Sequence, residues 1–328
     1  MNRRTFLGMG GLLAGVATLG LLPATPGLAQ YGAGQPAPEF VGLSGWLNTT
    51  GPITLAEQSG HVVLVDFWTY SCINCRRTIP YLNRWHNEYG PLGLRVISIH
   101  TPEFGFERMR QNVAEGVKEL GIQYPVGQDN HFQTWRAWNN EAWPAFYILD
   151  RDGRVVLVRE GEGYAHEMEA VIRDLLNLGP GAPHKGDDPD LSRIASPEMY
   201  FGSIHPTPQD RAQAPRPGEA TYAYANGPGP RLNTYRLDGT WFREKEALVL
   251  RSSKGGLRMR FSAAKLHLVA SAPTPTPIHI RVDGGDARSL QIEHPTLYTL
   301  VDGDRYAEHL VEVETDQAGL SLFSATFG

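Results

Sequence analysis

The side chains best suited to chemistry in this sequence are Cys72 and Cys75, the only two cysteines among its 328 residues. A thiol attacks as a thiolate, so a working cysteine must be accessible and its negative charge must be stabilised. A disulfide between cysteines this close would close a very small loop, and the entropic gain from a disulfide grows with loop length. The pair therefore indicates redox or metal chemistry, and a four-cysteine zinc site is excluded.

The segments around the cysteine pair place it between a strand and a helix. Residues 61–68 form a nearly continuous apolar run, which is typical of a strand buried on both faces, and residues 76–89 have apolar side chains at helical spacing. Cys72 is then expected where the helix begins. Free backbone N–H groups and the helix dipole stabilise a thiolate at that position. Cys75, one turn further in, is expected to be buried and to resolve the mixed disulfide that Cys72 forms.

The rest of the chain predicts two domains. Apolar runs of strand length at 94–100, 145–149 and 155–158 alternate with helical spacing at 104–120, 132–138 and 167–178. Residues 30–180 are therefore expected to form an α/β sandwich. Residues 181–196 have the composition of a linker, and residues 197–328 contain short β-rich runs separated by Gly, Asp and Pro, which predict an all-β sandwich domain resembling a jelly roll.

The N-terminal residues 1–29 have the features of a twin-arginine signal peptide. Arg3 and Arg4 precede an uncharged apolar run, and small residues near Ala29 predict cleavage after that position. The run is shorter than the roughly 20 residues that a membrane span needs. The formal net charge of −5, without a basic run, argues against nucleic-acid binding. We therefore expect a periplasmic or otherwise extracytoplasmic protein.

Three features around the cysteines resemble the thioredoxin superfamily. Val65-Asp66-Phe67-Trp68 runs into the Cys-x-x-Cys motif, Pro80 lies five residues after Cys75, and Trp143-Pro144-Ala145 precedes a predicted strand. The resemblance implies a thioredoxin-like sandwich in which buried Asp66 accepts a proton from Cys75. It also implies that Pro144 follows a cis peptide bond, faces the disulfide and lets an extended substrate pair with the neighbouring backbone.

A longer set of motifs, in order along nearly the whole chain, resembles the extracytoplasmic region of DipZ-type proteins, relatives of the TlpA reductases. The motifs are Trp68-Thr69-Tyr70-Ser71-Cys72-Ile73-Asn74-Cys75, His100-Thr101-Pro102-Glu103-Phe104, Trp143-Pro144-Ala145, Pro197-Glu198-Met199-Tyr200-Phe201-Gly202 and Phe323-Ser324-Ala325-Thr326-Phe327-Gly328. The resemblance implies a reductase of disulfides in exported proteins, with no metal and no cofactor besides the Cys72–Cys75 disulfide. DipZ-type proteins also contain a membrane electron-transfer domain, which this sequence lacks. We therefore expect a separate membrane electron donor of the CcdA or DsbD type, or else a protein that acts as an oxidant.

Further residues near the motif are candidates for tuning the thiols or contacting substrate. Trp68 is expected in the core. The candidates are Tyr70 and Trp143 as an aromatic rim, Ile73 and Asn74 between the cysteines, and His100 and Glu103 after the second strand.

Two other functions of the cysteine motif stay open. Thr69 lies three residues before Cys72, as in thiol peroxidases, although Val65 stands where peroxidase motifs have a proline. A copper carrier is the second alternative, because thiolates are soft ligands that bind Cu(I). The strand-to-helix position of the motif and the presence of Pro144 favour disulfide exchange over both.

The β domain has its own weak candidate site. Trp241, His279, His294 and His309 suggest carbohydrate or metal binding, but they lack metal-ligand spacing. Scattered histidines in β proteins are usually structural.

Overall fold

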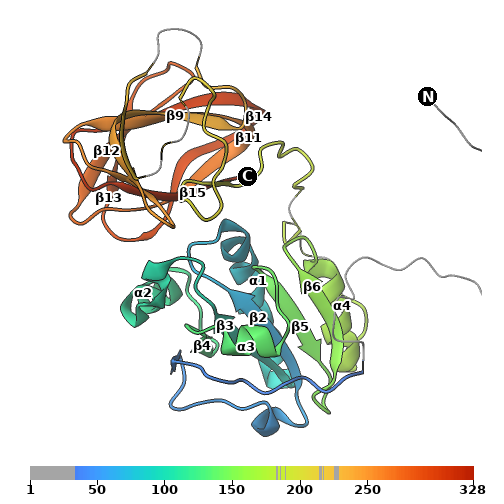
Figure 1. Ribbon diagram of the computed structural model, residues 1–328. Coiled ribbons are helices and arrows are strands. Elements are labelled where there is room, and N and C mark those ends of the chain that lie inside the picture. Colours follow the sequence, from blue (N-terminus) through green and yellow to red (C-terminus); the bar gives the residue numbers. More distant parts are fainter. Residues whose placement is uncertain are drawn as a thin grey trace, which may run out of the picture.

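The computed structural model describes residues 34–181, 184, 186–188, 190–213, 216, 218–224 and 229–328. The predicted signal peptide lies outside the described residues. Figure 1 shows two domains: a blue-to-green α/β domain and an orange-to-red β domain that lies over one end of it. Within the described ranges, no helix is long and apolar enough to cross a membrane.

A six-stranded mixed sheet forms the centre of the α/β domain, in the order β1-β4-β3-β2-β5-β6. Strand β2 pairs in parallel with β3, which pairs in parallel with β4, whereas the β1–β4, β2–β5 and β5–β6 pairs are antiparallel. The strands are β1 (Gly45–Leu47), β2 (Val62–Trp68), β3 (Leu94–His100), β4 (Val126–Gln128), β5 (Ala145–Leu149) and β6 (Val155–Glu160).

Every residue of β2 is buried, as its apolar run predicts. Successive side chains of a strand point to opposite faces of the sheet. Val65 and Phe67 therefore pack on one face, together with Trp138 and the segment around Phe40. Trp68 packs on the other face, against helices α1 and α4. The same alternation directs Asp66 toward the face covered by α1.

The helices follow the predicted spacing with one interruption. They are α1 (Ile73–Tyr89), α2 (Arg110–Glu119), α3 (Gln133–Ala137) and α4 (Ala165–Leu175), with short 3-10 turns η1 (Ala56–Gln58), η2 (Gly90–Leu92) and η3 (Gly105–Arg108). The prediction of a single helix over 104–120 is wrong, because the backbone of Met109 is extended and separates η3 from α2. Glu107 caps the start of η3, because its side chain turns inward and binds the backbone N–H groups of Glu103 and Phe104.

The β domain forms a nine-stranded sheet in which β9 also pairs with β11 and closes part of it. The short β-rich runs predicted in this domain are in two places single long strands, β11 (Gly255–Ser271) and β14 (Thr296–Thr315), so the prediction of short strands is wrong there. Bulges bend β11 without ending its pairing with β14. The strands are β7 (Met199–Tyr200), β8 (Gly218–Tyr222), β9 (Thr234–Arg243), β10 (Leu248–Leu250), β11 (Gly255–Ser271), β12 (Thr276–Val282), β13 (Arg288–Ile292), β14 (Thr296–Thr315) and β15 (Ser321–Phe327).

The candidate sugar or metal residues of the β domain have structural partners. Trp241 is 1% exposed and its indole N–H donates to the Asp238 carbonyl at 2.7 Å. His279 contacts Ser289, and His309 contacts Asp283. His294 stacks loosely on Tyr298. A buried indole cannot offer its face to a sugar ring, so the interpretation of Trp241 as a binding platform is wrong.

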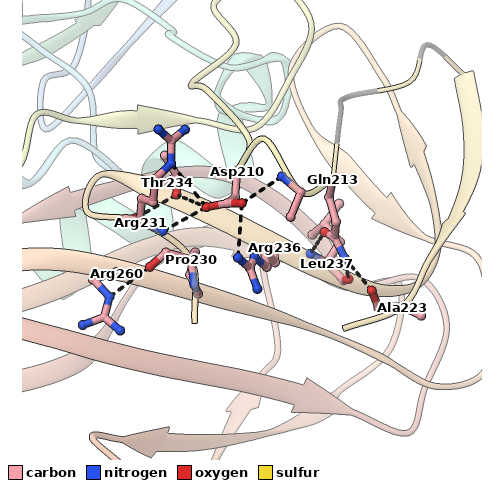
Figure 2. Close-up of polar contacts among 10 residues, drawn as sticks. Asp210, Gln213, Ala223, Pro230, Arg231, Thr234, Arg236, Leu237 and Arg260 are labelled. Atoms are coloured by element: carbon pink, nitrogen blue, oxygen red, sulfur yellow. Dashed lines mark hydrogen bonds and ion pairs between the residues drawn. The ribbon is translucent and has the colours of Figure 1, made fainter. Parts of the chain in front are cut away.

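A buried carboxylate attaches the segment before β8 to strand β9 (Figure 2). Asp210 accepts a hydrogen bond from the Arg231 backbone N–H at 2.9 Å and forms an ion pair with Arg236 at 3.3 Å. Nearby, Gln213 bonds both the N–H and the carbonyl of Leu237, each at 2.7 Å. Side-chain contacts thus add to the isolated β-bridge between Gln209 and Tyr235, which pairs the backbone of this segment with β9.

We predict that Asp210→Ala lowers the free energy of unfolding by about 3 kcal/mol, because it removes the acceptor of the Arg231 and Ala212 backbone N–H groups and a buried ion pair with Arg236. The measurement is urea unfolding. Asp316→Ala, which breaks the exposed Lys254–Asp316 pair, is the control and should cost less than about 1 kcal/mol. Burial alone would raise the pKa of Asp210, but backbone N–H groups and Arg236 outweigh it and lower this pKa to about 2. The stabilisation should therefore be complete above pH ~4 and disappear as the pH falls through about 2. Equal losses in the two variants would contradict this role.

Candidate functional site

Cys72 and Cys75 lie where β2 gives way to α1. Cys72 is half-buried and caps the helix with extended backbone, whereas Cys75 is fully buried. The backbone N–H of Cys75 donates to Cys72 Sγ at 3.4 Å, so the helix N-terminus is directed at the outer sulfur. Burial raises the pKa of the Cys75 thiol well above its usual range, and the neighbouring Cys72 raises it further. The geometry provides an accessible sulfur and a protected one behind it.

Asp66 lies beneath the cysteines, as the resemblance implies. It is fully buried and accepts a hydrogen bond from Ser98 Oγ at 2.6 Å through Oδ2, while Oδ1 has no hydrogen-bond partner among the described residues. Burial raises the pKa of Asp66 to about 7, with Ser98 opposing the shift. The charge of Asp66 in turn contributes to the raised pKa of Cys75, so the two groups are close enough to interact. The free oxygen can therefore accept a proton inside the site.

The Trp143–Pro144 peptide bond is cis, as predicted. Pro144 is buried just before β5, and Trp143 is half-buried. The Trp143 indole N–H donates to the Thr101 carbonyl at 3.1 Å, and its ring packs on Trp135 at 4.4 Å. These contacts attach the cis-proline loop to the segment that follows β3, at the end of the sheet where Cys72 lies.

Glu107 is a site residue that sequence reasoning missed. Its fully buried carboxylate accepts hydrogen bonds from Thr69 Oγ1 at 2.5 Å and Ser71 Oγ at 2.6 Å, and from the N–H groups of Glu103 and Phe104 at 2.6 and 2.8 Å. Burial raises its pKa, and these hydrogen bonds oppose the shift. The carboxylate joins the loop before the reactive cysteine to the loop after β3. No local pattern identifies it, because its hydroxyl partners lie more than 35 residues away in sequence.

Tyr70 and His100 are buried, so the prediction that Tyr70 forms an exposed rim is wrong. Their rings stack at 5.7 Å, and the Tyr70 hydroxyl donates to the Pro295 carbonyl of the β domain at 3.1 Å. Tyr70 also packs on Gly116 of α2, where an added Cβ would lie 2.7 Å from the tyrosine. Burial lowers the pKa of His100 to about 3, so this imidazole is neutral at physiological pH. The predicted substrate contact by His100 is excluded, and a role in tuning stays a prediction.

The two residues between the cysteines have different surroundings. Ile73 is 9% exposed and packs with Val269 and Leu297 of the β domain. Asn74 is half-buried and accepts a hydrogen bond from the Arg77 guanidinium at 3.2 Å. The β domain therefore covers Ile73.

Glu103 and Trp143 come together in a pocket of about 280 Å³ between the domains. The Tyr200 hydroxyl of the β domain donates to Glu103 Oε1 at 2.7 Å. Burial raises the pKa of Glu103, and the neighbouring carboxylates of Glu198 and Glu107 raise it further. Glu103 thus contacts the β domain as well as the loop after β3.

We predict that Glu107→Gln lowers the free energy of unfolding by about 2 kcal/mol. In glutamine an NH2 group, which donates hydrogen bonds, replaces one carboxylate oxygen, which accepts them. Hydroxyl or backbone N–H groups that donate to that oxygen then lose their acceptor. The looser loop should also speed alkylation of Cys72 by iodoacetamide. Urea unfolding and mass spectrometry measure the two effects. Glu115→Gln on exposed α2 surface is the control, and unchanged stability and alkylation in Glu107→Gln would contradict the role.

A mixed sheet with a half-exposed cysteine at a helix N-terminus, a second cysteine behind it and a cis-proline opposite defines the thiol–disulfide oxidoreductases of thioredoxin-like fold. The chain belongs to this thioredoxin superfamily, as a thioredoxin-like thiol–disulfide oxidoreductase. Two family models match it: the AhpC/TSA family over residues 33–158, and the thioredoxin-like C-terminal domain over residues 196–328.

Two named relatives and a solved structure are similar to this chain over different lengths. Protein DipZ of Mycobacterium tuberculosis is 36% identical over 334 residues, covering 99% of this chain and 47% of DipZ. Thiol-disulfide oxidoreductase YkuV of Bacillus subtilis is 30% identical over 122 residues, covering 37% of this chain and 80% of YkuV. A thioredoxin-like protein solved in its oxidized form is 28% identical with a TM-score of 0.41, covering 44% of this chain and 96% of that structure. The chain spans about half the length of the DipZ relatives.

Proposed function

We propose that the protein is an exported reductase of disulfides in extracytoplasmic proteins, working through the Cys72–Cys75 dithiol. The observation that carries this proposal is the graded burial of the two sulfurs above Asp66. Cys72 is accessible at a helix N-terminus, and Cys75 lies behind it over a carboxyl group with one free oxygen. Export is supported by the twin arginine and apolar run of the N-terminal sequence.

The reaction proceeds in two exchanges. The Cys72 thiolate attacks one sulfur of the client disulfide, forming a mixed disulfide and releasing the other client sulfur as a thiolate that takes up a proton. Cys75 then passes its proton to Asp66 and attacks Cys72 Sγ. The second client sulfur leaves as a thiolate and takes up a proton, and Asp66 releases the proton that it received. The client has then gained two electrons and two protons, and the Cys72–Cys75 disulfide remains. In the first exchange, the backbone N–H of Cys75, which donates to Cys72 Sγ at 3.4 Å, stabilises the negative charge of the attacking Cys72 thiolate.

Each cycle requires an external dithiol that reduces the Cys72–Cys75 disulfide again. A separate membrane electron donor of the CcdA or DsbD type fits this need. The DipZ relatives are about twice as long as the matched region, which leaves room in them for further domains.

Reduction of insulin disulfides tests the proposal. The wild-type protein, kept reduced with dithiothreitol, should precipitate insulin faster than the reductant alone, and Cys72→Ser should lower the rate to that of the reductant. Cys75→Ser should accumulate a mixed disulfide between Cys72 and the client, because nothing resolves it. Non-reducing electrophoresis detects this adduct. A wild-type rate equal to that of Cys72→Ser would refute the function.

The resolving step should depend on the ionisation of Asp66. Only the ionised carboxylate accepts the Cys75 proton, so the wild-type rate should rise with pH through about 7. Asp66→Asn should slow the step about 100-fold and remove that inflection, because the amide accepts no proton. Stopped-flow kinetics on a preformed Cys72 mixed disulfide measures both effects, with exposed Asp152→Asn as the matched control. An inflection that persists in Asp66→Asn would contradict the role.

A thiol peroxidase is the second candidate, favoured by the match of residues 33–158 to the AhpC/TSA family. The outer thiolate would then attack a peroxide and form a sulfenic acid, with loss of the alcohol or water. Peroxide consumption that requires Cys72 and persists without Cys75 would favour this function over client reduction.

A further inference from the structure

The pocket between the domains is built from both of them beside the cis-proline loop. Glu103, Phe104 and Trp143 of the α/β domain form one side. Tyr200, Gly202, Ile204, His205, Lys245 and Glu246 of the β domain form the other. The residue next to cis-Pro144 is thus also a wall of a pocket that the α/β domain alone cannot form.

The wall of the pocket from the α/β domain is apolar and held in place. Phe104 is buried and packs on Phe323 of β15 at 5.2 Å. Trp143 is restrained by its hydrogen bond to Thr101 and by packing on Trp135. Rigid aromatic walls offer contact area at little cost in conformational entropy.

The wall from the β domain is also preformed. Gly202 lies so close to the next segment that an added Cβ would be 2.3 Å from the Lys245 carbonyl. That carbonyl also accepts hydrogen bonds from the N–H groups of Ser203 and Ile204, at 2.9 and 3.1 Å. The Ile204 side chain is nevertheless 55% exposed, one of the most exposed large apolar side chains among the described residues. An apolar side chain fixed at the mouth of a pocket is suited to contact an apolar ligand group.

The polar groups around the pocket are largely occupied. Glu246 accepts a hydrogen bond from the Gly105 backbone N–H at 2.7 Å, and Glu103 is bonded to the Tyr200 hydroxyl. Glu103 lies close to Glu198 and Glu107, and burial among these carboxyls favours its neutral form. The remaining charge, Lys245, is exposed at the rim. The interior therefore matches an apolar group better than an ion.

We propose that this pocket binds an apolar side chain of the client polypeptide, close in sequence to the client cysteine, so that the β domain selects clients for the α/β domain. The proposal rests on the disulfide exchange proposed above. An extended chain that pairs beside Pro144 directs alternate side chains to opposite sides, and the pocket lies on the Trp143 side. Its volume of about 280 Å³ is below the range of roughly 300–1,000 Å³ typical of whole small-molecule sites, and suits one large aliphatic or aromatic side chain.

Short peptide disulfides test the inference. Each peptide carries one cysteine, disulfide-bonded to a chromophoric thiol, in a Gly/Ser sequence with leucine at one of the three positions on either side. The parent peptide has serine at every such position. For the wild-type protein, kcat/KM should be about tenfold higher with leucine at one position than for the parent, the discrimination expected from burial of one apolar side chain.

Ile204→Asp should bring this leucine-to-serine ratio close to one, because a charge at the pocket mouth opposes apolar binding. Leu92→Asp introduces the same charge at a leucine that is 51% exposed in the α/β domain and should keep the wild-type ratio. A wild-type ratio near one at every position, or a ratio unchanged in Ile204→Asp, overturns the inference alone. A wild-type protein that reduces none of the peptides overturns the disulfide reductase function, and the inference with it.

Discussion

The burial of Cys75 and Asp66 behind a half-exposed Cys72 is the constraint on which the site depends. An ionisable carboxyl and a thiol are costly to bury without partners, and both pKa values are raised as a result. The sheet accommodates them because β2 is covered on both faces and its alternation directs Asp66 toward α1. The same burial leaves Asp66 Oδ1 without a hydrogen-bond partner among the described residues, as the proton transfer that we propose requires.

The loops around the motif are held by hydrogen bonds between distant segments. Glu107 joins the loop before Cys72 to the loop after β3, and Trp143 joins the cis-proline loop to Thr101. Both attachments are made at the end of the sheet where the motif lies, next to Trp68 and His100, the last paired residues of β2 and β3. In the proposed resolving step, Cys75 attacks Cys72 Sγ in line with the bond that breaks. This step needs restrained loops, because small displacements of the reacting atoms slow a reaction strongly.

The β domain changes the surface that the α/β domain presents. It covers Tyr70 and Ile73, which would otherwise surround the reactive sulfur, and it adds Tyr200 and Ile204 beside the cis-proline loop. Residues from both halves of the chain therefore surround the cysteine motif and the cis-proline loop. The client selection that we propose depends on the two domains together.

The sequence by itself determined the local features: the buried strand 62–68, the helix that begins at the motif, the cis-proline before β5 and the β-rich second half. The strand, the helix and the β-rich half follow from apolar periodicity and motif spacing, which act over a few residues. The cis-proline was implied by the resemblance to the thioredoxin superfamily. Only the tertiary structure decided the burial of Tyr70, the inward turn of Glu107, the merging of β strands through bulges and the pocket shared by Glu103 and Ile204. Each depends on contacts between segments far apart in sequence, where side-chain type alone does not reveal the partner. Cys72 and Cys75 were identifiable from their spacing, but their different exposure depends on how the helix packs against the sheet and on what the β domain covers.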